Sequence, residues 1–268
     1  MLLPVQGRNI AYDLVGPDNA PTVCITHSLA SDGGSWAEQV PALLQAGFRV
    51  LRLDMRGHGG SDPVHGDYTM RALADDVAHV LEALAIPRVH YIGLSIGGMI
   101  GQAFALAHGQ RLISALWCDT LPASPQGAQA AWDERINTVR RANSLLPLAD
   151  ATVERWLNDE FKARNPRRWQ QTRDTVVGTT PAGYLGCCAA ILDFDFVPRL
   201  PSVRAPVLVV CGADDPGTPA AENRRLASLV PGARYEEMAG CLHFPNVEQP
   251  DRFNQIMMGW LEAHKRAR

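Results

Sequence analysis

Short apolar runs recur along most of the chain, and most of them are bounded by Gly, Pro or Asp and separated by segments long enough for a helix. Such runs are typical of strands in a parallel sheet whose two faces are covered by helices. We therefore predict a mostly parallel sheet with strands at residues 22–26, 49–53, 89–92, 113–118, 207–211 and 234–238. Two further runs, 2–5 and 9–14, flank Gly7 and Arg8 and predict an N-terminal hairpin.

Helical spacing is clearest in two places. From residue 69 to 85, apolar side chains recur at three- and four-residue intervals behind Thr69, a residue type suited to cap a helix. The end of the chain repeats the pattern, with Phe253, Met257, Trp260 and Leu261 on one face of a predicted helix. We expect both apolar faces to pack in the core.

The alternation of strands and helices breaks between residues 120 and 200. Helical patterns continue there without a convincing strand, over a stretch far longer than an ordinary connection. We therefore predict a helical cap at 120–200, inserted between the two parts of an α/β core, 1–119 and 201–268. The cap carries several tryptophans and a group of arginines: Arg135, Arg140, Arg141, Arg155, Arg164, Arg167, Arg168 and Arg173. Most of these arginines are expected on solvated helix faces.

Composition and charge narrow the class of protein. The 268 residues are 46% hydrophobic and 20% charged, which is enough to bury a sizeable core. A net charge of −3 without a basic stripe argues against nucleic acid as a partner. The N-terminus does not resemble a signal peptide and no window approaches a membrane span, so we expect a cytoplasmic protein with no membrane partner. Six cysteines lack metal-ligand spacing and are expected to be reduced, with no metal bound.

The pentapeptide Gly93-Leu94-Ser95-Ile96-Gly97 follows the predicted strand at 89–92 and precedes a helical pattern. A serine on a sharp turn between strand and helix projects its hydroxyl above the sheet, and the flanking glycines relieve contacts that a Cβ would make with the backbone. We interpret Ser95 as a nucleophile, which requires a histidine and an orienting carboxylate at the same sheet edge.

Both partners are found after later strands. Asp215 follows the run at 207–211, and His243 follows the run at 234–238, so that the chain order is Ser95, Asp215, His243, the order of an α/β-hydrolase triad. Two other acids compete with Asp215. Asp214 is its neighbour, and Asp119 follows the strand at 113–118 and could reach the histidine in some arrangements.

Acyl transfer also needs two backbone N–H groups aimed at the developing oxyanion. The residue after the nucleophile, Ile96, supplies one. Leu29, in the loop Thr26-His27-Ser28-Leu29-Ala30 after an earlier strand, is predicted to supply the other. His27 and Ser28 are expected to shape this loop.

Four segments together resemble the α/β-hydrolase superfamily, and in particular the 3-oxoadipate enol-lactonases. They are 93–98, 54–61 with the sequence DMRGHGGS, 215–219 with DPGTP, and 243–250 with HFPNVEQP. Cap segments around Arg155-Trp156-Leu157 and at 181–191 extend the resemblance over nearly the whole chain. Ile96 stands where these lactonases usually carry methionine, and the loop at 27–30 departs from their Asn-Ser-Leu-Gly pattern.

The resemblance implies a cofactor-free serine hydrolase that opens the enol-lactone of 3-oxoadipate, a step of the bacterial β-ketoadipate pathway of aromatic catabolism. A carboxylesterase acting on small aryl or alkyl esters and an acyl-homoserine lactone hydrolase stay open as alternatives. The implied substrate carries a carboxylate, for which Arg141 and Arg155 are candidate ligands. Trp132 and Trp156 are candidates for the walls of the substrate site.

Overall fold

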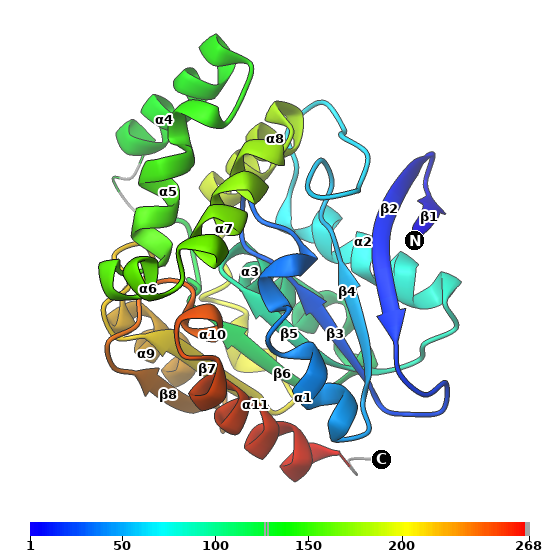
Figure 1. Ribbon diagram of the computed structural model, residues 1–268. Coiled ribbons are helices and arrows are strands. Elements are labelled where there is room, and N and C mark those ends of the chain that lie inside the picture. Colours follow the sequence, from blue (N-terminus) through cyan, green and yellow to red (C-terminus); the bar gives the residue numbers. More distant parts are fainter. Residues whose placement is uncertain (126, 128, 266–268) are drawn as a thin grey trace.

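One eight-stranded sheet organises the protein, whose computed structural model describes residues 1–125, 127 and 129–265 (Figure 1). The strands are β1 (Leu2–Val5), β2 (Arg8–Val15), β3 (Thr22–Thr26), β4 (Arg49–Leu53), β5 (Val89–Leu94), β6 (Leu112–Cys118), β7 (Val207–Gly212) and β8 (Arg234–Met238). Their order is β1-β2-β4-β3-β5-β6-β7-β8. The hairpin β1-β2 is antiparallel and joins β4 in antiparallel fashion, whereas β3 to β8 all run parallel. The predicted mostly parallel sheet and N-terminal hairpin are confirmed.

Helices cover both faces of the sheet. Outside the cap they are α1 (Val40–Gln45), α2 (Met70–Ala83), α3 (Ile96–His108), α9 (Ala220–Leu229), α10 (Pro245–Glu248) and α11 (Pro250–His264). Helices α1 and α11 contact each other on one face, and α2 and α3 pack together on the other (Figure 1). The sheet is therefore the middle of three layers, which explains why its central strands are buried along their whole length.

The two helices predicted from spacing form as expected. The Thr69 side chain accepts a hydrogen bond from the Ala72 N–H and so caps α2, whose face from Met70 to Leu81 is buried. In α11 the apolar face carrying Phe253 and Trp260 is buried against the core.

In the described residues between β6 and β7 the α-helices are α4 (Gln129–Ala142), α5 (Ala149–Trp156), α6 (Asp159–Arg164), α7 (Pro166–Gly178) and α8 (Pro181–Leu192). They form the helical cap beyond one edge of the sheet (Figure 1). The chain enters and leaves the cap side by side, because Ala123 and Asp195 form an antiparallel bridge. The predicted boundaries between the core and the cap, at 119/120 and 200/201, stay a prediction. Among the described helices, none alone is long and apolar enough to cross a membrane, and α7 with α8 reaches that length only across a 90° bend.

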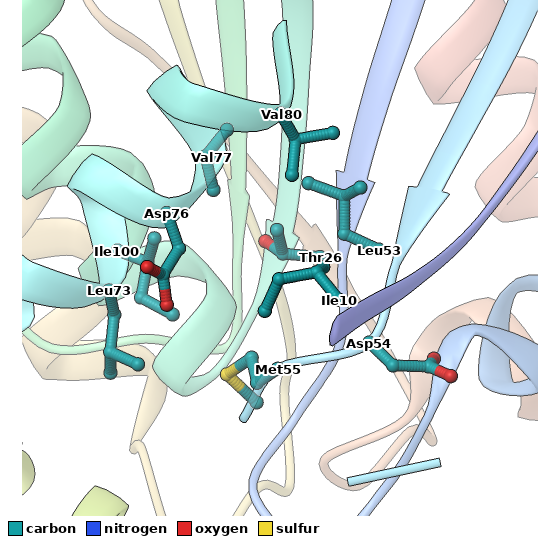
Figure 2. A pocket seen from close by; sticks show the side chains of 10 residues that line it. All are labelled: Ile10, Thr26, Leu53, Asp54, Met55, Leu73, Asp76, Val77, Val80 and Ile100. Carbon is teal, nitrogen blue, oxygen red and sulfur yellow. The ribbon is translucent and has the colours of Figure 1, made fainter. Parts of the chain in front are cut away.

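A small internal cavity lies in the core between α2 and the sheet, where the side chains of Leu53, Val77 and Val80 surround it (Figure 2). Its volume of about 20 Å³ is enough for about one water molecule. The cavity is too small for a ligand.

The parallel register brings the carboxyl ends of the six strands β3 to β8 to one edge of the sheet. Thr26 at the end of β3 pairs with Gly93 in β5, and Leu94 pairs with Cys118 at the end of β6. The ends of β7 and β8 also align, since Gly212 pairs with Met238. The loops that follow these strands therefore meet beneath the cap, at the edge where open α/β sheets bind their ligands.

Candidate active site

Ser95 lies on the sharp turn between β5 and α3. Its backbone has φ 58° and ψ −117°, a conformation that costs free energy for a residue with a Cβ and that marks functional turns. The turn is held from two sides, because the Ser95 N–H donates to the Cys118 carbonyl at 2.8 Å and the Thr120 hydroxyl donates to the Ser95 carbonyl at 2.8 Å. The candidate nucleophile is thus fixed by the end of the neighbouring strand β6 and by the residues directly after it.

The two glycines of the pentapeptide are required by close backbone contacts. A Cβ on Gly93 would lie 2.2 Å from the carbonyl oxygen of Gly97, and a Cβ on Gly97 would lie 2.8 Å from the carbonyl oxygens of Thr26 and His27. These distances are far below normal contact, so only glycine lets α3 begin directly above the ends of β3 and β5.

Asp215 and His243 form a hydrogen-bonded pair, with the Asp215 Oδ2 atom 2.7 Å from the His243 Nδ1 atom. Both side chains are buried. The Gly217 N–H at 2.7 Å and the Thr218 hydroxyl also donate to the Asp215 carboxylate. Burial alone would raise the pKa of Asp215, but the histidine and these donors outweigh it and hold the pKa well below its usual range. An ionised Asp215 accepts the Nδ1–H of His243 and leaves Nε2 unprotonated.

The two competing acids differ from Asp215 in their surroundings. Asp214 is exposed. Asp119 is fully buried, where it accepts hydrogen bonds from the Gly212 N–H at 2.8 Å and the Cys118 thiol at 3.0 Å. Burial, reinforced by the negative charge of Asp215, raises the pKa of Asp119 well above its usual range. The surroundings of Asp119 therefore disfavour its charge, whereas those of Asp215 favour it.

The loop after β3 presents backbone N–H groups to the same place. In the described chain neither the Leu29 N–H nor the Ile96 N–H has an acceptor, so both are available to an oxyanion. The His27 ring braces this loop, because its Nδ1 bonds the Ser28 carbonyl at 2.8 Å and its Nε2 accepts from the Met55 N–H at 2.9 Å. The expected structural role of His27 agrees with these bonds.

A cavity of about 280 Å³ opens between this edge of the sheet and the cap. Ser95, Asp215 and His243 line its floor together with Leu29, and the cap contributes Trp132, Arg155, Trp156, Arg135 and Tyr184. Trp156 stacks on Phe244, with ring centroids 4.4 Å apart, beside the histidine. Ile96 is buried beneath the floor, where its N–H and not its side chain is relevant. Seven of the nine residues predicted from the sequence thus line one cavity.

Arg141 requires a correction. It is exposed on α4, where its guanidinium donates to the Thr138 hydroxyl, and it does not line the cavity. Six residues advance an α-helix by about 240° beyond one full turn, so Arg141 points away from the face on which Arg135 lies. Arg135 was missed as a site residue, although its spacing of three from Trp132 places the two on one helix face. Its guanidinium lies 5.3 Å from the Trp132 ring centroid.

The described residues hold one group of potential metal ligands whose donor atoms all lie within 4.8 Å of one another, and it consists of Asp119, Asp215 and His243. Each member already has a hydrogen-bond partner in the protein. The cluster therefore needs no metal ion to explain it.

The fold and this geometry together define an α/β hydrolase. The family model for the alpha/beta hydrolase fold matches residues 21–250, and the chain belongs to that family. It is 31% identical to 3-oxoadipate enol-lactonase 1 of Acinetobacter baylyi over 98% of this chain and 97% of that protein.

Solved structures agree in fold. The enol-lactonase of Burkholderia xenovorans LB400 superposes with a TM-score of 0.93 at 35% identity, over 98% of this chain and 100% of the other. An N-acyl homoserine lactone degrading enzyme superposes with a TM-score of 0.83 at 28% identity, over 97% and 100% of the two chains. The family match and these relatives together identify the protein as an ester-hydrolysing enzyme of the α/β-hydrolase family.

Proposed function

We propose that the protein is a serine hydrolase that opens a small lactone through an acyl-enzyme on Ser95, and we favour 3-oxoadipate enol-lactone as the substrate. The observation that carries this proposal is the single cavity lined by Ser95, by the Asp215–His243 pair and by two cap arginines, Arg135 and Arg155. A nucleophile, a base and a site for a substrate anion are all within reach of one small molecule.

In the proposed acylation, Nε2 of His243 takes the hydroxyl proton of Ser95 while Oγ attacks the lactone carbonyl carbon. Asp215 holds the Nδ1–H tautomer and stabilises the imidazolium that forms. The carbonyl oxygen becomes an oxyanion and accepts the N–H groups of Leu29 and Ile96. As the intermediate collapses, the ring C–O bond breaks and His243 gives its proton to the leaving enol oxygen.

Water completes the reaction. His243 takes a proton from a water molecule, whose oxygen adds to the acyl carbon, and the bond to Ser95 then breaks as His243 returns the proton to Oγ. One water is consumed for each lactone opened, and the product leaves as an open-chain carboxylic acid. The residues named supply every proton transfer in this scheme, which therefore requires no cofactor.

The arginines support a substrate with a carboxylate. Among the described residues, neither Arg135 nor Arg155 forms an ion pair with an acidic side chain. Burial, with a smaller contribution from the charge of Arg135, lowers the pKa of Arg155. Two guanidinium groups without carboxylates in a partly buried cavity are stabilised by an incoming anion. The volume of about 280 Å³ favours a small substrate.

The test is steady-state hydrolysis of freshly generated 3-oxoadipate enol-lactone beside p-nitrophenyl acetate, with Ser95→Ala as the control for each. We expect the lactone to be favoured in kcat/KM by about a thousandfold, equivalent to about 4 kcal/mol of transition-state binding. Full turnover by Ser95→Ala would refute the acyl-enzyme. Equal or better turnover of the ester would support the alternatives, a carboxylesterase of small aryl or alkyl esters or an acyl-homoserine lactone hydrolase.

The carboxylate site has its own test. Arg155→Met keeps the apolar stem of the side chain and removes the charge, so kcat/KM for the lactone should fall by about tenfold or more while p-nitrophenyl acetate is unaffected. Arg141→Met is the matched control, because this exposed arginine of α4 lies outside the cavity. Equal losses for the lactone and the ester would contradict a specific contact with the carboxylate.

A further inference from the structure

The joint between α5 and α6 in the cap touches the loop that carries His243. The Phe244 N–H donates to the Trp156 carbonyl at 3.1 Å, and the Asn158 side-chain amide donates to the Gly240 carbonyl at 3.0 Å. The Trp156 ring also stacks on the Phe244 ring, so this pair is joined by both a hydrogen bond and an aromatic contact. The cap is thus attached to the core directly beside the catalytic histidine.

A single buried side chain, Glu248 in α10, completes this attachment. Its Oε1 atom accepts the Asn158 N–H of the cap at 2.7 Å, and its Oε2 atom accepts the Leu242 N–H, one residue before His243, at 2.6 Å. Glu248 is 9% exposed. The carboxylate therefore bridges two main-chain donors that lie 84 residues apart in sequence (242 minus 158) and that belong to different parts of the molecule.

The surroundings of Glu248 disfavour its charge. Burial raises the pKa of Glu248 to about 7, the negative charges of Asp214 and Asp215 in the loop after β7 add to the rise, and the two N–H bonds oppose it. Cys241, in the same loop as His243, is a neutral thiol, because burial raises its pKa to about 12, and Arg252 of α11 faces that thiol. A buried acid whose two oxygens accept two main-chain N–H groups, so close to the triad, suggests a role beyond packing.

We propose that Glu248 is a positioning residue that connects the α5–α6 joint of the cap to the loop carrying His243. The position of the cap on the core and the alignment of the imidazole then both depend on one carboxylate. Glu248 does not touch the substrate cavity and acts through Leu242 and Asn158. The inference rests on the proposed Ser95 hydrolase, since the alignment matters only if His243 is the base.

Both oxygens of an ionised carboxylate accept N–H groups, whereas a protonated carboxyl turns one of them into a hydroxyl donor and loses one of the two bonds. Protonation of Glu248 should therefore lower activity in acid. This decline should not be accompanied by unfolding, because a raised pKa means that the folded protein takes up the proton more readily than the unfolded chain.

The first variant is Glu248→Gln, whose amide accepts one N–H and turns its own donors toward the other. With p-nitrophenyl acetate at pH 8.5 we expect kcat to fall by about tenfold, as for the loss of one charge-assisted hydrogen bond, with KM within about twofold of the wild-type value. Because the amide does not titrate, kcat of the wild type and of the variant should converge as the pH falls below the pKa of Glu248, about 7. Glu160→Gln, an exposed acid of α6, is the control for charge removal.

A second pair of variants covers the case in which Glu248→Gln does not fold. Asn158 has φ −69° and follows a residue in the extended region, so proline fits the backbone there. Asn158→Pro and Asn158→Ala both lose the side chain, but only the proline loses the N–H that Glu248 accepts. We expect kcat of the proline variant to be several-fold below that of the alanine variant.

The outcomes separate the two proposals. If Ser95→Ala abolishes hydrolysis and Glu248→Gln keeps the wild-type kcat over the whole pH range, the positioning role is refuted while the hydrolase stands. Equal kcat for Asn158→Pro and Asn158→Ala would refute it in the same way. If Ser95→Ala remains active, the proposed function itself fails.

Discussion

Replacing each of the two buried acids beside His243 by asparagine tests the assignment of the triad acid. Asp215 and Asp119 lie within 4.8 Å of the imidazole by their closest ligand atoms, yet their surroundings shift their pKa values in opposite directions. We expect Asp215→Asn to lower kcat/KM by about 10⁴ and Asp119→Asn by less than about tenfold.

The size of the Asp215 effect follows from the geometry. At the transition state the imidazolium faces the carboxylate across the 2.7 Å bond, with charge centres about 4 Å apart, and at an effective dielectric constant of about 20 their attraction is about 4 kcal/mol. That attraction corresponds to about a thousandfold in rate. An amide that presents its N–H₂ to Nδ1 also favours the wrong tautomer of His243, and we assign about another tenfold to that loss.

Asp119→Asn should have a mild effect on kcat/KM, because the buried surroundings of Asp119 already favour its neutral form. The amide oxygen of asparagine can still accept the Gly212 N–H, and only the weak thiol contact from Cys118 changes. The double variant, with asparagine at both positions, tests whether Asp119 can replace Asp215. Removing the charge of Asp215 lowers the pKa of Asp119, so residual activity that disappears in the double variant would identify Asp119 as a substitute acid.

The assay is the steady-state kcat/KM for p-nitrophenyl acetate at pH 8, with the melting temperature of each variant as the control for folding. A loss of a thousandfold or more in Asp119→Asn, together with more than a tenth of wild-type activity in Asp215→Asn, would reverse the assignment and refute the reasoning from burial.

Three further predictions concern the supporting structure. Gly93→Ala places a Cβ 2.2 Å from the Gly97 carbonyl, so we expect a loss of about 3 kcal/mol and of about 10 °C in melting temperature by calorimetry, whereas Gly259→Ala, with open space around it, should not destabilise. Thr218→Val removes one donor from the Asp215 carboxylate and should lower kcat/KM by about tenfold; an unchanged value would show that the hydroxyl is dispensable. The pKa of Glu248 lies near 7 in the fold against an ordinary 4.5, so its contribution to stability is present below pH 4.5 and is lost as pH rises to about 7; Glu248→Gln should flatten that part of the stability curve, and an identical curve would contradict the raised pKa.

The parts of the molecule that could be predicted from the sequence are those set by local physics. The strands are short apolar runs that stop at turn residues, and α2 follows from apolar spacing behind the Thr69 cap. The positions of Ser95, Asp215 and His243 follow from the ends of parallel strands, because parallel strands place those ends at one edge. The glycine spacing around Ser95 reflects a close approach between backbones that no other residue permits.

The side chains of the cap could not be assigned in this way. Which arginine faces the cavity depends on the rotation of α4 about its axis, and a group of arginines spread over several helices gives no preference for Arg135 over Arg141. Glu248 was also missed, because the feature that makes it unusual is its contact with Asn158, 90 residues away. Long-range contacts of this kind arise from packing and leave no local pattern in the sequence.

The antiparallel bridge between Ala123 and Asp195 has a consequence for how such enzymes diversify. Since the two ends of the cap already lie side by side on the core, a different helical segment of almost any length can be grafted at these points, with a closure entropy that grows only logarithmically with length. The hydrolytic machinery stays on the sheet during such an exchange. Substrate range and reaction chemistry can therefore evolve as separate modules of one chain, and a chimera with a foreign cap is a rational starting point for new specificity.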